Sequence, residues 1–152
     1  MDTGSAVLSW MKVHLRNGVT LFDTADVYPV KGGTSGDAVK VMGQAIALEP
    51  SIRSEIQIIA KLDIASFAPP YLNSSTAYIN EKVNWFLTNL NTNYLDILLL
   101  HYADTLMDAD AVAATFKSLK DSGKVLYFGT SNHKPHHFKL LQSRLDKYGI
   151  DL

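Results

Sequence analysis

Residues 19–28 read VTLFDTADVY, and the prediction of the fold begins with this segment. A short apolar run, Val19 to Phe22, ends abruptly at Asp23, and Tyr28 follows five residues later. A short apolar run that stops at a polar residue is typical of a buried strand whose end leaves the core. We therefore expect a strand over residues 19–23 that delivers a carboxylate at its carboxyl end and a phenol on the loop that follows.

Three more apolar runs follow along the chain, and each also ends in polar side chains. They cover residues 56–61, 95–100 and 125–129, and they end in Lys61, in His101, and in Ser131 with Asn132. Segments with the apolar spacing of a helix precede the first strand and follow every strand, over residues 5–16, 38–48, 75–90, 108–122 and 135–147. Strands that alternate with helices form parallel sheets through right-handed crossovers. The sequence therefore predicts an α/β fold with four parallel strands and a helix at the amino terminus.

The connections carry fewer signals than the strands. Asp37 stands just before the second helical segment, and we expect it to cap that helix. Residues 62–74 contain Pro69-Pro70, and we expect a long loop there. No linker or low-complexity stretch divides the chain, so residues 1–152 are expected to form a single domain.

The polar strand ends are the first candidates for a site. In parallel α/β sheets the carboxyl ends of the strands meet at one edge, and ligands bind there. Asp23, Lys61, His101 and the pair Ser131-Asn132 would bring an acid, a base, an imidazole and an amide to one rim. A single polar residue at a strand end is ordinary, because the chain leaves the core there, but the set as a whole favours a site.

Composition excludes several classes of protein. The net charge of −1 gives no electrostatic reason to bind nucleic acid or an acidic membrane surface. The chain has no cysteine and no apolar run of the roughly 18 residues that span a bilayer. The amino terminus, MDTGSAVLSWM, lacks the basic region and the long apolar core of a signal peptide. We expect a soluble cytoplasmic protein.

Competing motifs are weak or absent. The sequence has no G-x-G-x-x-G after the first strand and no G-x-S-x-G, which argues against a Rossmann site and a hydrolase nucleophile. The glycines of KGGTSG, residues 31–36, favour a flexible loop over a phosphate-binding loop. His133, His136 and His137 form a cluster that allows metal binding, but no acidic partner stands nearby in sequence, so a solvated helix start is favoured and no metal is expected.

Taken together, these segments resemble the aldo-keto reductase family. The resemblance rests on four stretches in order: GVTLFDTADVY at 18–28, IIAKLD at 58–63, LDILLLHYAD at 95–104 and GKVLYFGTSNH at 123–133. It covers nearly the whole chain, and residues 106–145 look most like a bacterial branch of predicted oxidoreductases. The resemblance implies a partial (β/α)₈ TIM barrel, made of the second to fifth βα units of the family.

The resemblance also implies an activity and the residues that perform it. It implies NAD(P)H-dependent reduction of an aldehyde or ketone to an alcohol, with NADPH expected and NADH as the alternative. Tyr28 would donate a proton to the carbonyl oxygen of a small substrate, and Lys61, held by Asp23, would assist. His101 would orient the carbonyl. Ser131 and Asn132 would bind the nicotinamide carboxamide.

Several positions depart from the pattern that the family implies. Tyr102-Ala103-Asp104 stands where Arg-Pro-Asp is usual, His133 replaces an aromatic residue, and Pro29 replaces a glycine. A full barrel takes about 250 residues, whereas this chain has 152 and resembles four of its units. We expect the half barrel to be closed by a second copy, by a complementing chain, or by the rest of a longer gene product. The alternative to an enzyme is a truncated, non-catalytic relative that acts as a binding or assembly subunit, or an inactive fragment.

Overall fold

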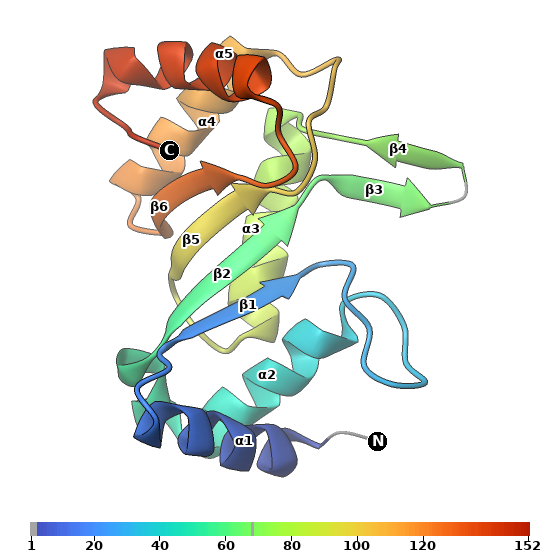
Figure 1. The fold of residues 1–152 in the computed structure, drawn as a ribbon, viewed down its shortest axis with the longest axis vertical. Coiled ribbons are helices and arrows are strands. Elements are labelled where there is room, and N and C mark those ends of the chain that lie inside the picture. Colours follow the sequence, from blue (N-terminus) through green and yellow to red (C-terminus); the bar gives the residue numbers. More distant parts are fainter. Residues whose placement is uncertain (1–2, 68) are drawn as a thin grey trace.

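Four parallel strands form the central sheet in the order β1-β2-β5-β6 (Figure 1). They are β1 (Leu21–Ala25), β2 (Gln57–Leu62), β5 (Leu95–Leu100) and β6 (Val125–Thr130). The computed structural model describes residues 3–67 and 69–152. The predicted α/β class and the four parallel strands are confirmed, and the arrangement is that of a partial TIM barrel.

Helices precede the sheet, connect its strands and follow the last one. Their bounds are α1 (Gly4–Arg16), α2 (Asp37–Leu48), α3 (Thr76–Asn89), α4 (Ala109–Asp121) and α5 (Pro135–Leu145), with the short 3₁₀ helices η1 (Pro50–Glu55) and η2 (Asp146–Tyr148). Ser75 caps α3 by accepting the N–H of Tyr78, and Asp108 caps α4 by accepting the N–H groups of Asp110 and Ala111. These caps explain why the predicted bounds of α3 and α4 lie within a residue or two of the observed bounds.

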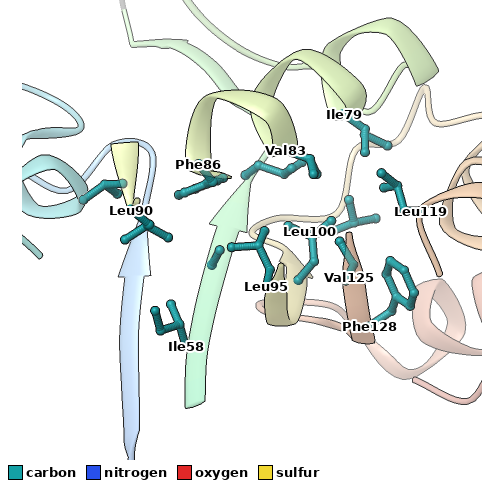
Figure 2. Packing of buried hydrophobic residues seen from close by; sticks show 14 of the residues in the cluster. Ile58, Ile79, Val83, Phe86, Leu90, Leu95, Leu100, Leu119, Val125 and Phe128 are labelled. Atoms are coloured by element: carbon teal, nitrogen blue, oxygen red, sulfur yellow. The ribbon is translucent and has the colours of Figure 1, made fainter. Parts of the chain in front are cut away.

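The core lies between the sheet and the helices on one of its faces. Ile79, Val83 and Phe86 of α3 are fully buried and point toward the strands (Figure 2). Ile58, Leu98 and Phe128 supply the strand side of this contact. Burying an aliphatic or aromatic side chain of this size stabilises the fold by about 1.5–3 kcal/mol, so this layer fixes the helices against the sheet.

The other face of the sheet carries the side chains that alternate with this core. The register places Asp23, Ile59, Ile97 and Tyr127 in one row across the four strands. The next row toward the carboxyl ends contains Ala25, Lys61, Leu99 and Gly129. Within the described residues this face is partly open, because Leu21 is 49% exposed and Tyr127 is 65% exposed. In a closed barrel it would be the inner face.

Three local predictions were wrong. The first strand covers Leu21–Ala25 instead of residues 19–23, so Asp23 lies in its middle and not at its end. It cannot begin at Val19, because the Val19 N–H donates to the His14 carbonyl at the end of α1. Asp37 does not cap α2: Gly36 occupies that position, and the Asp37 carboxylate accepts the N–H of Thr34 in the preceding turn. Residues 62–74 are not one long loop, because they contain an antiparallel hairpin of β3 (Ile64–Phe67) and β4 (Pro70–Leu72).

In the ranges 3–67 and 69–152, no helix is both long enough and apolar enough to cross a bilayer.

Candidate active site

The carboxyl ends of the four strands lie at one edge of the sheet, beside the β3–β4 hairpin (Figure 1). Asp23 lies within β1, Lys61 lies near the end of β2, and His101 directly follows β5. Ser131 and Asn132 directly follow β6. Parallel pairing places each of these strand ends next to its neighbour, so the predicted residues reach one rim.

Lys61 and Asp23 form an ion pair at the centre of this rim. The Lys61 ammonium donates to both carboxylate oxygens of Asp23. The Lys61 side chain is 8% exposed and that of Asp23 is 48% exposed, so the cation is held inside while the anion faces outward. Burial by itself lowers the pKa of Lys61, but its contacts with Asp23 and Tyr28 outweigh burial and raise this pKa above the ordinary value. Lys61 is therefore a fixed positive charge at neutral pH.

Tyr28 lies against this cation. A turn brings it back to the rim, with the Tyr28 N–H donating to the Ala25 carbonyl over 3.1 Å. The Lys61 Nζ atom lies 4.9 Å from the centroid of the Tyr28 ring. The centroids of the Tyr28 and His101 rings lie 5.9 Å apart, with the ring planes at 80°. The structure thus brings Tyr28, Lys61 and His101 together, with Asp23 paired to the lysine.

His101 is a nearly buried imidazole, 7% exposed, at the end of β5. Burial, and then the nearby Lys61 ammonium, lower the pKa of His101 below its ordinary value of 6.5, so the ring is neutral at neutral pH. Among the described residues its Nδ1 atom has no hydrogen-bond partner. A neutral imidazole can donate one hydrogen bond to a carbonyl oxygen without carrying a charge.

Ser131 and Asn132 lie next to His101, and their free hydrogen-bonding groups match a carboxamide. The Asn132 Nδ2 atom donates to the His101 carbonyl over 2.9 Å and to Ser131 Oγ over 3.1 Å. These bonds leave the Ser131 hydroxyl proton as a donor and Asn132 Oδ1 as an acceptor. A carboxamide carries one carbonyl acceptor and one amide donor group, so this pair fits the nicotinamide end of a cofactor.

Two buried carboxyl groups behind the rim were missed by the sequence analysis. Asp26 is 6% exposed, forms an ion pair with Lys82 at 3.4 Å and lies 3.5 Å from the Tyr78 hydroxyl. Asp63 is fully buried, and both its oxygens accept the N–H of Tyr102. Both residues stand inside the stretches singled out from the sequence, DTADVY and IIAKLD, but only their burial distinguishes them from solvated loop residues.

The histidine cluster lies beside this rim and not within it. The His133 Nδ1 atom lies 2.6 Å from the Ser131 carbonyl oxygen, and His136 and His137 belong to the first turn of α5. His133 and His137 line a small hollow with Asp104. In the part of the chain that the structure describes, no three histidine, cysteine or acidic side chains are arranged to hold a metal ion.

A half barrel of parallel strands with an acid, a lysine, a phenol and an imidazole at its carboxyl rim defines the class of protein as a TIM-barrel relative with a polar rim site. The sequence model of the aldo/keto reductase family matches residues 4–151. The chain therefore belongs to the aldo/keto reductase family, and the resemblance stated from its motifs is confirmed.

Curated relatives support this assignment. The chain is 40% identical over 146 residues to "Uncharacterized oxidoreductase YcsN" of Bacillus subtilis (strain 168), which covers 91% of this chain and 47% of that protein. It is 42% identical over 144 residues to "Oxidoreductase YdhF" of Escherichia coli (strain K12), with coverage of 91% and 47%. It is 32% identical over 152 residues to "6-dehydroglucose reductase" of Agrobacterium fabrum (strain C58 / ATCC 33970), with coverage of 95% and 50%. The chain thus spans about half the length of these relatives.

Proposed function

We propose that this chain carries the catalytic rim for reduction of an aldehyde or ketone to an alcohol with a nicotinamide cofactor. The observation that carries the proposal is the convergence of the Tyr28 ring, the Lys61 ammonium and the neutral His101 imidazole at one strand edge. Membership of the aldo/keto reductase family and relatives named as oxidoreductases support the same reaction class.

In this proposal each residue has a separate role. Tyr28 donates its phenolic proton to the carbonyl oxygen, and the Lys61 ammonium stabilises the phenolate that remains. Asp23 holds the Lys61 ammonium in place. The His101 imidazole donates a hydrogen bond to the carbonyl oxygen and so fixes the direction of the carbonyl group.

A nicotinamide cofactor, when bound, supplies the hydride that reduces the carbonyl carbon. Ser131 and Asn132 would hold its carboxamide, because the serine can donate and the Asn132 oxygen can accept a hydrogen bond. The carbonyl carbon gains the hydride and the oxygen gains the Tyr28 proton, so the product is the neutral alcohol. We propose NADPH as the cofactor, with NADH as the alternative.

The test is a comparison of Tyr28→Phe with the unaltered chain in a cofactor-oxidation assay. Nitrobenzaldehyde serves as the carbonyl substrate, and NADPH and NADH are assayed side by side by their absorbance. We expect kcat to fall by at least about a hundredfold in Tyr28→Phe, because proton transfer by a placed side chain contributes about that much. Tyr94→Phe is the matched control, since Tyr94 directly precedes β5 and so lies at the end of the sheet opposite the rim. Equal rates in the unaltered chain and in Tyr28→Phe would reject the proposal.

We also propose that the isolated chain self-associates, so that a second copy completes the sheet. The outer edges of β1 and β6 have no strand partner within the described residues, and the inner face carries exposed apolar side chains. Unpaired strand edges and exposed apolar faces favour association. Two copies would bring together eight parallel strands, the number in a closed barrel of this type.

A further inference from the structure

Asp63 is a fully buried carboxyl group that the proposed reaction does not use. It directly follows β2, two residues after Lys61, and none of its surface is exposed. The Tyr102 N–H donates to its two oxygens over 3.3 Å and 3.2 Å. Since Tyr102 follows His101, Asp63 contacts the segment that carries the imidazole.

The backbone at Asp63 is strained. Its φ angle is 105°, a region that residues other than glycine rarely adopt. Such a conformation persists only where the surroundings determine it, and these positions gather at functional sites. The strained backbone turns the carboxyl group of Asp63 toward the end of the neighbouring strand, β5.

The peptide group between His101 and Tyr102 is held from both sides. Its N–H is bound by Asp63 from the end of β2, and its carbonyl is bound by the Asn132 amide from the end of β6 over 2.9 Å. Asn132 also has a positive φ, of 54°. The end of β5 is held further by the His101 N–H, which donates to the Leu62 carbonyl over 2.9 Å.

We propose that Asp63 is a positioning residue for His101: its carboxyl group, opposite Asn132, fixes the His101–Tyr102 peptide and with it the direction of the imidazole. The importance of that direction for turnover rests on the proposed function. The contact itself does not, because it joins groups within this chain. Asp63 therefore acts through the backbone and does not touch the substrate.

The charges around Asp63 make this contact sensitive to pH. Burial raises the pKa of Asp63 to about 8. The N–H groups of Tyr102 and His101 oppose this rise. The carboxylates of Asp26 and Asp104 add to it. Tyr78 of α3 faces the same cluster, Lys82 is paired with Asp26, and Lys61 is paired with Asp23. Asp63 therefore ionises near pH 8, and ionisation strengthens the bond from the Tyr102 N–H.

The experiment is nuclear magnetic resonance of the full ¹⁵N-labelled chain with three variants. Asp63→Gly removes the carboxyl group and tolerates the positive φ. Asp63→Asn keeps an acceptor oxygen but does not titrate. Asp104→Asn is the matched control, because Asp104 is a neighbouring carboxyl group that accepts the N–H groups of Leu106 and Ser74 instead. The His101 ring signals are assigned by their loss in His101→Gln.

We expect amide exchange at Tyr102 to be about tenfold faster in Asp63→Gly and close to the unaltered rate in Asp63→Asn and Asp104→Asn, because only the glycine variant loses the acceptor. The His101 ring signals should show a step near pH 8 in the unaltered chain and no such step in Asp63→Asn. In Asp104→Asn the step should persist at a lower pH, because this variant removes one of the carboxylates that raise the pKa of Asp63. Unchanged Tyr102 exchange in Asp63→Gly, or a step that persists in Asp63→Asn, would overturn the inference. If Asp63→Gly does not fold, Tyr102 exchange in Asp63→Ala decides, because alanine also removes the acceptor of the Tyr102 N–H.

Amide exchange and the ring titration do not depend on catalytic activity, so they test the positioning of His101 separately from the proposed function. An unaltered chain that reduces no carbonyl compound rejects the proposed function and leaves the positioning inference to the resonance data. Where the chain is active, Asp63→Gly should lower kcat/KM about tenfold and Asp63→Asn should restore most of it, because an oriented group loses effectiveness when its support loosens.

Discussion

Asp26 and Asp63 are buried carboxyl groups behind the rim, and their protonation links the stability of the chain to pH. Burial raises the pKa of Asp26 from its ordinary value of 3.8 to about 6, although Lys82 opposes the rise. Burial raises the pKa of Asp63 to about 8. In both cases the folded chain holds the proton more tightly than the unfolded chain does.

The sign of the pH effect follows from these shifts. A carboxyl group with a raised folded pKa stabilises the fold fully below the unfolded pKa, and this contribution is lost as the pH rises through the folded pKa. We expect the free energy of unfolding to fall from about pH 4 to pH 6 through Asp26 and to continue falling toward pH 8 through Asp63. The Asp26 contribution over its range is about 1–3 kcal/mol.

Urea unfolding at a series of pH values measures this prediction. Asp26→Asn should flatten the fall below pH 6, and Asp63→Asn should flatten the fall up to pH 8. The slope is the readout, because Asp26→Asn also removes the ion pair with Lys82 and shifts the whole curve. Asp121→Asn, at an exposed ion pair with Lys117, is the control. His101 acts in the opposite direction, because its folded pKa is lowered, so the comparison between variants decides. Slopes in Asp26→Asn and Asp63→Asn that equal the slope of the unaltered chain would contradict the assignment.

The sequence predicted some of the individual residues at the rim and missed others, and this difference has a physical reason. Asp23, Lys61 and His101 are visible because each ends an apolar run, and parallel strands bring such ends together. Asp26 and Asp63 cannot be recognised from the sequence, because their burial depends on Tyr78 and Lys82 of α3 and on the segment after β5. Contacts between segments far apart in sequence leave no local pattern.

The elements are joined by two contacts that the sequence pattern does not show. At the amino-terminal end of the sheet, the buried Arg53 guanidinium forms an ion pair with Asp96 at 2.6 Å and donates to the Ile56 and Tyr94 carbonyls. Asp96 also accepts the Ile58 N–H from β2. Arg53 follows α2 and Asp96 lies in β5, so this network fixes the helix connection to two strands at the end opposite the rim.

The second contact is the close approach of α2 to the end of α3 at Gly43. A Cβ atom on Gly43 would lie 1.7 Å from the Asn89 carbonyl oxygen, and the Asn91 amide donates to the Gly43 carbonyl over 3.0 Å. Glycine is required here by space, and not by its backbone angle.

Gly43→Ala should therefore destabilise the chain by at least about 2 kcal/mol, because α2 must move away from α3 and loses packing along their contact. The helix propensity of alanine offsets about 1 kcal/mol of any larger cost. Chemical unfolding measures the change, with Gly123→Ala as a control where no atom lies within 4 Å of the added group but φ is positive. Gly43→Ala with unchanged stability would contradict the close contact.

The elements that the sequence predicted well carry local signals, and the element that it missed does not. The strand 95–100 matches β5, and α3 and α4 begin after Ser75 and Asp108, which cap them. The sequence does not predict the β3–β4 hairpin, because Pro69-Pro70 interrupts a short and only partly alternating segment. Its pairing depends on where β2 and α3 place its two ends.

At the scale of the whole molecule, the sheet has a covered face and an open one. Ile79, Val83 and Phe86 of α3 bury the first, whereas Leu21 and Tyr127 are exposed on the second. The family match accounts for this asymmetry, because the inner face of a barrel is filled by side chains from strands on its other side. In the described part of the 152-residue chain, this sheet has four strands, half the number in a closed barrel.

The last prediction tests whether a second copy covers this face. We expect sedimentation at micromolar concentration to show a dimer or larger species, because pairing buries Tyr127, Leu21 and the free edges of β1 and β6. Tyr127→Asp should weaken association by at least about tenfold, since a carboxylate on this face would be buried and has the same charge as Asp23 in its row. Leu106→Lys should leave the association unchanged, because Leu106 is 92% exposed. A clean monomer that unfolds cooperatively would show instead that the open face is tolerated in water, and that the half barrel holds its rim without a second copy.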